Sequence, residues 1–413
     1  MSERVILHCD LNNFFASVEC LSHPEYRDVP MAVCGSVEER HGIVLAKNEQ
    51  AKKFGVKTAE AIWEAQVKCP ELVIAPPHYD EYVKYSKLVR SIYEEYTDRV
   101  EPFGMDECWL DVSGSTLIFG SKREIADEIR RRIKRETGLT ISVGVSFNKV
   151  FAKLASDMKK PDAVTVIDRD HFRSIVWKLP AEDMIGVGRA TKKRLNSIGI
   201  YTIGDIAKTD LSTLRLTFGK SGEQLWRFAA GKDLSPVLSK SEIPPAKSVG
   251  RSVTCAHDLK STDEVSAVML YLTGKVAASL RENHAMATAV QIHIRDENLI
   301  VKECQAPLSQ PTRIIEMLFS LGMELFSKTW NWDKNVRSIG IRACDLVAED
   351  SFSQYNLFYS SLRYDKLEKL ESKIFDICSK YGKNAIFRAS TMKLAVPKKE
   401  NLGMVDVRYM AKN

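Results

Sequence analysis

The stretch Glu-Pro-Phe-Gly-Met-Asp-Glu-Cys-Trp-Leu-Asp-Val, residues 101–112, places two adjacent acids, Asp106 and Glu107, directly before an apolar run. A second apolar run, residues 5–7, leads to Asp10. Both runs are typical of buried strands, so the three carboxylates would lie beside strands. Such carboxylates are costly to bury unless they are paired or bind a cation. The alternative is that the aspartates cap turns and Glu107 is a solvated surface acid.

Magnesium suits this set of acids. It prefers oxygen ligands and is often held by one or two carboxylates together with the phosphates of a substrate. Two such ions stabilise the attacking and the leaving oxygen of a phosphoryl transfer. The acids therefore indicate a site for a pair of divalent cations.

Two further runs carry a family resemblance. Residues 10–19 read Asp-Leu-Asn-Asn-Phe-Phe-Ala-Ser-Val-Glu, and residues 143–161 read Val-Gly-Val-Ser-Phe-Asn-Lys-Val-Phe-Ala-Lys-Leu-Ala-Ser-Asp-Met-Lys-Lys-Pro. Together with Met-Asp-Glu at 105–107, they resemble the Y-family of translesion DNA polymerases, and within it the bacterial DNA polymerase IV type. The resemblance covers residues 1–358, with the motifs in the family's order.

The resemblance implies roles for the acids. Asp10 and Asp106 would be ligands of two magnesium ions, and Glu107 would be the ligand nearest the primer 3′-hydroxyl. The carbonyl of Leu11 would complete the shell of one ion.

The resemblance also implies a nucleotide site. Phe14 and Phe15 would contact the incoming nucleotide, and Phe15 would be the steric gate that leaves no room for a 2′-hydroxyl. Lys160 and Lys52 would reach the triphosphate. Taken alone, Phe15 would be a core aromatic, since phenylalanine is often buried, and a lysine in so basic a segment would be solvated.

Two positions depart from the family pattern. A serine usually stands two residues before the second aspartate, where this chain has Gly104. The segment that commonly reads Tyr-x-Ala-Arg is Glu-Gln-Ala-Lys at 49–52. Its lysine offers a phosphate a point charge without the bidentate fork of arginine. Its glutamate places an anion near the expected triphosphate, so we expect Lys47 or Lys53 to compensate.

By resemblance, the activity is template-directed addition of deoxynucleotides to a primer 3′ end, with an open active site that tolerates damaged templates and without proofreading. One rival is a non-catalytic, clamp-docked DNA-binding scaffold of the same family. The three retained acids argue against it. A second rival is a palm-type nucleotidyl cyclase, which would have no use for DNA-binding domains.

Composition agrees with a nucleic-acid enzyme. The chain has 413 residues, 44% apolar content and a net charge of +6, which predicts two to four domains. No apolar run is long enough to span a bilayer and the first residues do not resemble a signal peptide, so we expect a cytoplasmic protein without membrane contact. The nine cysteines form no Cys-x-x-Cys pair and are expected to be free thiols. We expect a monomer.

The predicted fold is of the α/β class, an α+β multidomain chain built as a right-hand polymerase. Its parts are a palm, fingers, a thumb with a helix-hairpin-helix, and a little finger that is a split βαβ sandwich. The predicted bounds are 1–167 for the palm with inserted fingers at about 16–77, 168–233 for the thumb, 234–246 for a linker, 247–350 for the little finger, and 351–413 for a clamp-binding motif with a helical and basic tail.

Three segments are expected to bind DNA or a partner. Gly186 and Gly188 precede a basic helix that contains Lys192, and backbone amides at such a helix start face a DNA phosphate without reading bases. In the little finger, strand residues are candidate phosphate contacts, namely Arg251, Arg295 and Arg342. Gln-Tyr-Asn-Leu-Phe at 354–358 resembles the peptide with which bacterial polymerases dock on the sliding clamp, through Gln354, Leu357 and Phe358.

The chain continues past this peptide. Apolar residues recur at helical spacing over 362–380, which predicts an amphipathic helix. We expect its apolar stripe, formed by Tyr364, Leu367, Leu370, Ile374 and Ile377, to dock on the body of this protein rather than on a separate partner.

Overall fold

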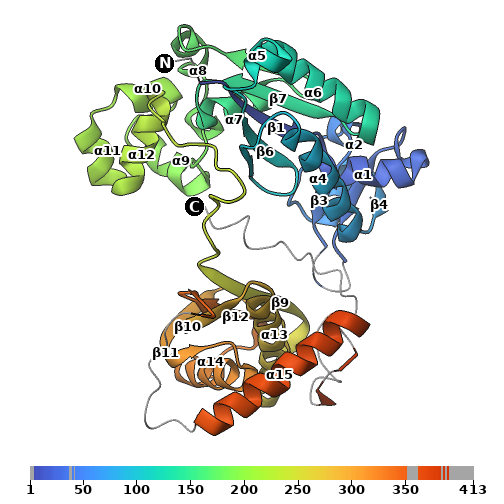
Figure 1. The fold of residues 1–413 in the computed structure, drawn as a ribbon, viewed down its shortest axis with the longest axis vertical. Helices are drawn as coiled ribbons and strands as arrows, with labels where there is room; N and C mark the ends of the chain where they lie inside the picture. Colours follow the sequence, from blue (N-terminus) through green and yellow to red (C-terminus); the bar gives the residue numbers. More distant parts are fainter. Residues whose placement is uncertain are drawn as a thin grey trace. The chain divides into compact units, whose positions relative to one another are not determined.

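The chain is divided into two units in the computed structural model (Figure 1). The structure describes residues 4–36, 40, 42–350, 361–382, 385–386 and 388–389. Unit 1 contains Met1–Cys34 and Val44–Pro244, and unit 2 contains Gly35–Ile43 and Pro245–Ala411. In the described part of the chain, no helix is long and apolar enough to cross a membrane.

A five-stranded sheet with the strand order β5-β6-β1-β7-β8 lies at the centre of unit 1. β1 pairs antiparallel with β6 on one side and with β7 on the other, and β8 is parallel to β7. All six residues of β1 are buried, because neighbouring strands and helices enclose it on every side. The strands are β1 (Ile6–Leu11), β5 (Val100–Pro102), β6 (Glu107–Asp111), β7 (Ile141–Ser146) and β8 (Val164–Ile167).

Helices cover both faces of this sheet. α4 (Tyr79–Glu94) and α6 (Lys122–Thr137) pack on the face that carries Leu7 and Cys9. α7 (Lys149–Met158) packs on the opposite face, where its Ala152 meets Ile6. α6 is preceded by a capping box formed by Ser121 and Glu124 and is followed by Gly138 in a left-handed conformation, which ends the helix.

A smaller sheet follows β1 in the sequence, with the order β3-β2-β4. The side chain of Asn48 caps α2 by accepting a hydrogen bond from the Ala51 amide, and it also binds the backbone of Met31. The elements of this region are α1 (Phe14–Ser22), η1 (Pro24–Tyr26), β2 (Met31–Cys34), β3 (Val44–Lys47), α2 (Glu49–Lys53), α3 (Ile62–Lys68) and β4 (Val73–Ala75).

The rest of unit 1 is helical, and its last segment returns to the large sheet. Val237 is fully buried against Ile6 and Trp109, and the Leu238 amide donates to Glu101 at 3.0 Å. The first half of the expected linker is therefore fixed to the sheet, which its composition did not predict. The helices are α5 (Thr116–Phe119), α8 (Phe172–Val176), η2 (Ala181–Asp183), α9 (Arg189–Asn196), α10 (Ile203–Lys208), α11 (Leu211–Phe218) and α12 (Lys220–Ala229).

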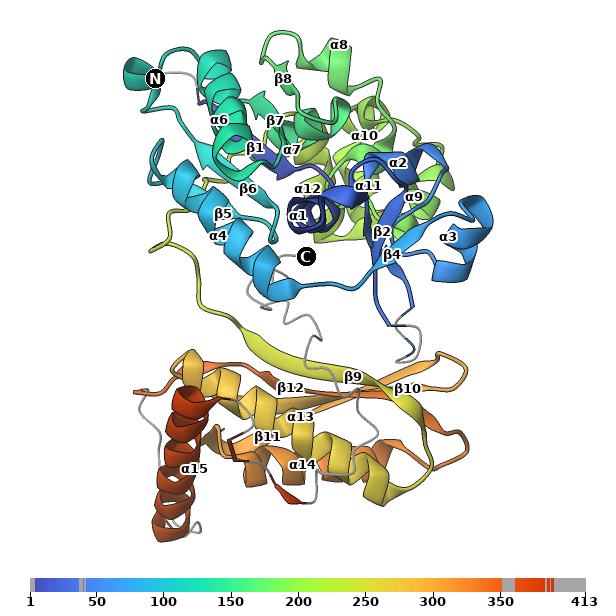
Figure 2. The same ribbon diagram turned by 90° about the vertical axis from the view of Figure 1, so that its right-hand side faces the viewer.

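Unit 2 is built on a four-stranded antiparallel sheet with the order β11-β10-β12-β9. Figure 2 shows α13 and α14 side by side on one face of this sheet, where they close an apolar core. The elements are β9 (Ser248–Leu259), α13 (Thr262–Glu282), β10 (Ala285–Asp296), β11 (Val301–Thr312), α14 (Ile315–Thr329), β12 (Val336–Cys344) and β13 (Val347–Ala348). This order of elements confirms the predicted split βαβ arrangement.

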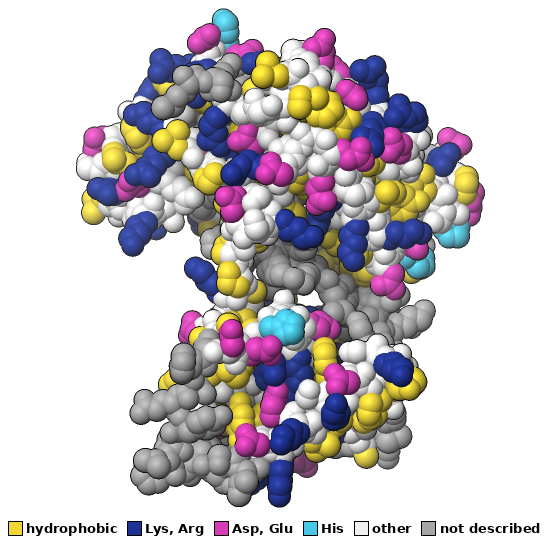
Figure 3. All heavy atoms as spheres, viewed as in Figure 1, with side chains coloured by type: hydrophobic (Ala, Val, Ile, Leu, Met, Phe, Trp, Pro, Cys, Tyr) yellow, Lys and Arg dark blue, Asp and Glu magenta, His cyan; other side chains and the backbone are white. Residues whose placement is uncertain are grey.

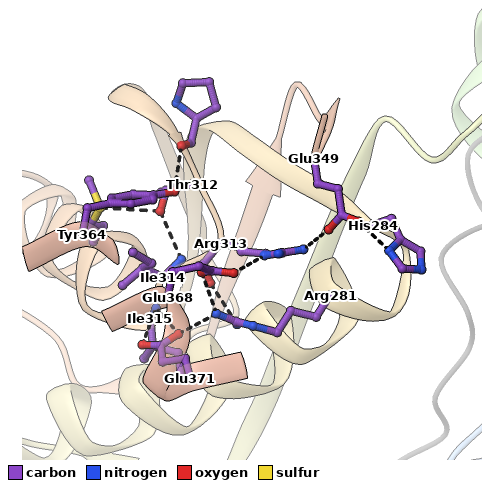
Figure 4. A network of polar contacts seen from close by, with 12 residues as sticks. Arg281, His284, Thr312, Arg313, Ile314, Ile315, Glu349, Tyr364, Glu368 and Glu371 are labelled. Carbon is purple, nitrogen blue, oxygen red and sulfur yellow. Dashed lines mark hydrogen bonds and ion pairs between the residues drawn. The ribbon is translucent and has the colours of Figure 1, made fainter. Parts of the chain in front are cut away.

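The last helix, α15 (Ser361–Tyr381), docks on unit 2, as predicted. Its docking is largely ionic (Figure 4). The buried Glu371 accepts from Arg281 at 3.0 Å and from the Ile315 amide, at the start of α14, at 3.1 Å. Glu368 adds ion pairs with Arg281 and Arg313.

The predicted apolar stripe was therefore wrong in part. Leu370 and Ile377 are exposed, whereas Glu371 is buried. A buried carboxylate is acceptable here because arginine and a helix N-terminus both compensate its charge.

Candidate active site

The strand register brings two of the predicted acids together. Asp10 of β1 and Glu107 of β6 are direct partners across the antiparallel pair, so their side chains lie on the same face of the sheet. Asp106 immediately precedes β6, and its carbonyl accepts the amide of Leu11 at 3.0 Å. The end of β1 and the start of β6 therefore hold all four residues predicted as ligands.

The turn that carries Asp106 is held from behind by α4. Arg90 donates to the Gly104 carbonyl at 2.7 Å, and Ser86 donates to the carbonyl of Met105. Gly104 has a φ of 109°, a conformation that side-chain-bearing residues rarely adopt. This backbone conformation accounts for glycine where the family usually has serine.

One face of α7 supplies cations to the acids. Lys149, Lys153 and Ser156 follow one another at helical spacing, and Lys160 continues the row beyond the helix end. Lys153 donates to Oε2 of Glu107 at 2.6 Å, and Lys160 donates to Oδ2 of Asp10 at 2.6 Å.

A glycine allows this helix to lie so close to the sheet. A Cβ atom on Gly144 would stand 1.9 Å from the carbonyl oxygen of Ala152 and 2.4 Å from the amide nitrogen of Ser156. Gly144 lies opposite His8 in the register of β1 and β7. The close approach thus occurs next to the acids, and it lets short side chains of α7 reach β1.

The three acids differ in electrostatic state. Burial raises the pKa of Asp106 to about 6, helped by the charges of Glu107 and Asp10. Burial also raises the pKa of Asp10. The charge of Glu107 adds to this rise, and the two effects together outweigh the lowering effect of Lys160. Burial alone would raise the pKa of Glu107, but His8 and Lys153 reverse this and lower it to about 2.

These differences fit a cation site. Among the described residues, no Lys, Arg or His side chain forms an ion pair with Asp106, and the charge of Lys153 only partly opposes the rise of its pKa. In the same part of the chain, no three acidic, His or Cys side chains are arranged so that they alone could hold a metal ion, so waters and substrate oxygens would have to complete the shell of any bound cation. Lys160 donates to Oδ2 of Asp10, and Lys153 donates to Oε2 of Glu107. The second oxygen of each acid is left for a cation. The chemistry of the donors suits magnesium, which keeps waters and substrate oxygens in its shell.

The predicted gate residue is part of an aromatic cluster. Phe15 is half-buried and stacks on Tyr82, with ring centroids 4.1 Å apart and planes 10° apart, and Tyr79 meets it edge-on. The Tyr82 hydroxyl donates to the buried Glu19. Phe14, by contrast, is buried in the core. The ring of Phe15 is thus held in place from behind.

The residues at 49–52, which depart from the family pattern, form contacts within this part of the structure. Glu49, the first residue of α2, accepts from the side-chain amide of Asn13 at 2.8 Å, and Lys52 lies 3.5 Å from the same oxygen. Asn13 has a φ of 49° and directly precedes Phe14. The expected compensating lysines bind elsewhere, since Lys47 donates to Thr58 and Lys53 to Gln50. Lys52 itself balances Glu49.

The predicted helix-hairpin-helix is present in unit 1. Gly186 has a φ of 90°, and Gly188 is the N-cap of α9 without a side-chain cap. The amides at the start of α9 are therefore not satisfied by a capping side chain, as a phosphate site requires. Lys192 lies in the first turns of this helix and forms an ion pair with Glu182.

The three arginines of unit 2 fall on different faces of its sheet. Arg342 is paired with Gly250 and Gln291, and Arg295 with Ser338, so both lie on the face away from α13 and α14. Arg251, which was also predicted as a candidate phosphate contact, does not lie on this open face. It is paired with the core residue Ile341, and its guanidinium donates to Ser279 of α13 at 2.9 Å, so it is a structural contact of the helix face.

Charge on the visible surface is mixed. Figure 3 shows Lys and Arg side chains interspersed with Asp and Glu over the face in view. The predicted clamp peptide, Gln354 to Phe358, lies outside the described residues.

Sequence reasoning missed three residues of this site. His8, Lys153 and Ser156 contact Glu107 or each other, yet none was singled out. The available signals were the alternation of Ile6, His8 and Asp10 on one strand face and the helical spacing within residues 149–160. The pairing between the two segments could not be read from either one.

Comparisons with known proteins agree with this architecture. Residues 9–157 match the impB/mucB/samB family, residues 246–357 match its C-terminal domain, and residues 182–233 match the DNA polymerase-iota thumb domain. A solved Y-family DNA polymerase chimera of Dbh and Dpo4 shares the fold, with a TM-score of 0.73 and 24% identity, over 83% of this chain and 99% of that one.

Two curated relatives cover nearly the whole chain. DNA polymerase IV of Acetivibrio thermocellus is 51% identical over 94% of this chain and 97% of its own length. DNA polymerase IV 1 of Bacillus subtilis is 37% identical over 94% of each chain. The chain therefore belongs to the Y-family of DNA polymerases, in the group named DNA polymerase IV. It is a DNA-directed DNA polymerase of the translesion class.

Proposed function

We propose that this polymerase extends a primer 3′ end by two-metal phosphoryl transfer at Asp10, Asp106 and Glu107. The observation that carries the proposal is the direct pairing of Asp10 with Glu107 beside Asp106, which forms no ion pair with any residue that the structure describes. The three carboxylates and the Leu11 carbonyl would hold two magnesium ions. Bound there, these ions would lower the pKa of the primer 3′-hydroxyl and neutralise the pyrophosphate leaving group.

The protein's own residues position the reactants. His8 and Lys153 keep Glu107 ionised, and Lys153 donates to its Oε2 at 2.6 Å, so Oε1 would be the oxygen left for the cation nearest the primer end. Lys160 bridges Asp10 and Asp157. Burial by itself would lower the pKa of Lys160, but the charges and hydrogen bonds of these two acids outweigh burial and raise it. We assign Lys160 to the triphosphate, because a fully charged ammonium beside Asp10 is where phosphate oxygens must come to reach a shared cation. Positioning and charge stabilisation supply most of phosphoryl-transfer catalysis.

The remaining nucleotide contacts follow from the aromatic cluster and α2. Phe15, held by Tyr82, serves as the steric gate against a 2′-hydroxyl. When a nucleotide binds, the ammonium group of Lys52 moves from Glu49 to the triphosphate. Glu49 keeps its hydrogen bond from Asn13. As the family resemblance implies, the polymerase works without proofreading, and its fidelity rests on nucleotide selection.

DNA is held at two surfaces. The start of α9, with Gly186, Gly188 and Lys192, binds a backbone phosphate. Arg295 and Arg342 bind phosphates on the open face of the unit 2 sheet. Both contacts address the DNA backbone, so binding is independent of base sequence and weakens with salt.

The cellular setting is proposed as well. Gln354 to Phe358 dock on the sliding clamp, and the polymerase works as a monomer in the cytoplasm. All nine cysteines are free thiols, which suits a reducing compartment.

Primer extension on an undamaged template with magnesium tests the proposal. The wild type is expected to extend the primer, and the double variant Asp106→Ala, Glu107→Ala is expected to bind DNA without extending it. A matched control removes the same two charges from exposed positions of the same unit, as Glu94→Ala, Asp98→Ala. DNA binding without extension by the wild type would instead favour the clamp-docked scaffold.

A further inference from the structure

A fully buried histidine stands directly behind Glu107. His8 of β1 has no exposed surface. Its Nδ1 atom lies 2.8 Å from Oγ of Ser156 on α7, and its Nε2 atom lies 3.3 Å from Oε2 of Glu107. At this distance the Nε2 atom is buried without a hydrogen-bond partner, and the Glu107 carboxylate is the acceptor beside it. Buried polar atoms without a full partner are rare, and this one points at a predicted catalytic acid.

The donors and acceptors determine how the ring must be protonated. A carboxylate oxygen accepts hydrogen bonds, so Nε2 must carry a proton to face Oε2 favourably. In the neutral ring Nδ1 is then an acceptor, and the Ser156 hydroxyl must supply its proton. That hydroxyl also donates to the Lys153 carbonyl inside α7 at 2.7 Å, so its single proton has two possible acceptors. The tautomer with a proton on Nε2 requires the hydroxyl to turn to Nδ1, so Ser156 controls the histidine tautomer.

The arrangement depends on the close approach of α7 at Gly144. Gly144 lies opposite His8, and a side chain there would push Ser156 away from the ring. The same helix carries Lys153, which occupies Oε2 of Glu107 at 2.6 Å. Two contacts from α7, one direct and one through His8, thus converge on a single oxygen.

We propose that His8 is a positioning residue for Glu107: together with Ser156 it fixes Oε2, so that Oε1 is the oxygen presented to the catalytic cation. The inference rests on the proposed role of Glu107 and adds a residue to it. Removal of a group that orients a metal ligand typically lowers metal affinity or activity by about 10- to 100-fold.

The competing explanation is packing. The His8 ring meets Trp109 at 5.2 Å with planes 60° apart, so any flat ring would fill the space. A packing role requires volume, whereas a positioning role requires a donor at the Nε2 position. Two substitutions separate these requirements. His8→Gln places an amide donor near Nε2, and His8→Phe keeps a ring without a donor.

The first measurement is the affinity of the full chain, bound to primer-template DNA, for Mn²⁺ added as the only divalent cation. The electron paramagnetic resonance signal of free Mn²⁺ reports how much of it is bound. We expect His8→Phe to weaken Mn²⁺ binding by about 10- to 100-fold and His8→Gln to stay near the wild type. In extension assays, the Phe variant should lower kcat and raise the magnesium requirement while leaving the KM for nucleotide unchanged. Thermal unfolding reports whether each variant is folded.

Equal Mn²⁺ affinity of His8→Phe and the wild type would overturn the proposal, as would equal losses in the Phe and Gln variants. If His8→Phe does not fold, Ser156→Ala decides the matter. It removes the donor to Nδ1 and is expected to weaken Mn²⁺ binding about tenfold, so unchanged binding would exclude the relay. Wild-type extension in the same experiment shows separately whether the proposed function holds.

Discussion

Asp106 is predicted to destabilise the folded protein when no cation is bound. Its side chain is half-buried beside Asp10 and Glu107 and, among the described residues, has no ion-pair partner. Replacing it with asparagine removes the charge at almost unchanged volume. The variant Asp106→Asn should therefore be more stable than the wild type in the absence of metal, although it loses primer extension.

The magnitude follows from the pKa. Folding raises the pKa of Asp106 from 3.8 to about 6, a rise of roughly two pH units, and each unit corresponds to 1.36 kcal/mol. The upper bound is about 3 kcal/mol, and the residual solvent contact of the side chain reduces it to about 2 kcal/mol. This is a large share of the 5–15 kcal/mol that typically stabilises a domain.

The sign depends on pH. Below pH 3.8 the carboxyl is protonated in the folded and the unfolded chain, so the wild type carries no penalty. Between pH 3.8 and about 6 the unfolded chain ionises while the folded one stays protonated, so wild-type stability falls with rising pH. Above pH 6 the difference is constant. The advantage of Asp106→Asn should thus appear between pH 4 and 6 and be complete at pH 7.5.

Urea unfolding in EDTA at pH 4.5 and pH 7.5 measures this difference. Asp98→Asn is the matched control, since its carboxylate is exposed in the same unit. Excess magnesium should restore wild-type stability, because a cation that binds the folded state stabilises it by mass action. An Asp106→Asn variant that is no more stable than Asp98→Asn at pH 7.5, or equally stabilised at both pH values, would refute the electrostatic reasoning.

Four further outcomes are expected. Phe15→Ala should admit ribonucleotides, and unchanged ribonucleotide incorporation in single-turnover assays would show that the sugar does not contact this ring. Lys52→Ala should raise the KM for nucleotide about tenfold through loss of a charge-assisted contact worth roughly 1.4 kcal/mol; an unchanged KM would place that contact elsewhere. Gly144→Ala should destabilise unit 1 by about 3 kcal/mol, since its Cβ would overlap the Ala152 carbonyl, and a wild-type urea midpoint would contradict the close packing. Deleting residues 354–358 should abolish stimulation by the clamp but leave extension of short primers intact, and equal stimulation of both forms would count against docking.

The sequence by itself determined where the chemistry lies along the chain. Asp10 and the pair Asp106-Glu107 follow or precede strand-like apolar runs, and a strand can be recognised locally from its residue types. The same holds for α6, whose cap residues and 3.6-residue period are local signals. The order of strands and helices in unit 2 was likewise legible, because each element is specified by its own stretch.

The tertiary structure decided which groups meet. The ion pairs of Lys153 with Glu107 and Lys160 with Asp10 join segments 46 and 150 residues apart, and strand register with the Gly144 contact sets them. Register also sends Arg251 to the helix face, because a shift of one residue reverses the side of a strand side chain.

The docking of α15 shows the same limit. Its apolar spacing predicted a helix but not the face that is buried, since Glu371 is compensated by Arg281 and by the Ile315 amide from distant elements. A local sequence pattern specifies a helix or a strand because the interactions that form it join residues only a few positions apart. Compensation of a buried charge depends on partners that only the folded chain brings within reach.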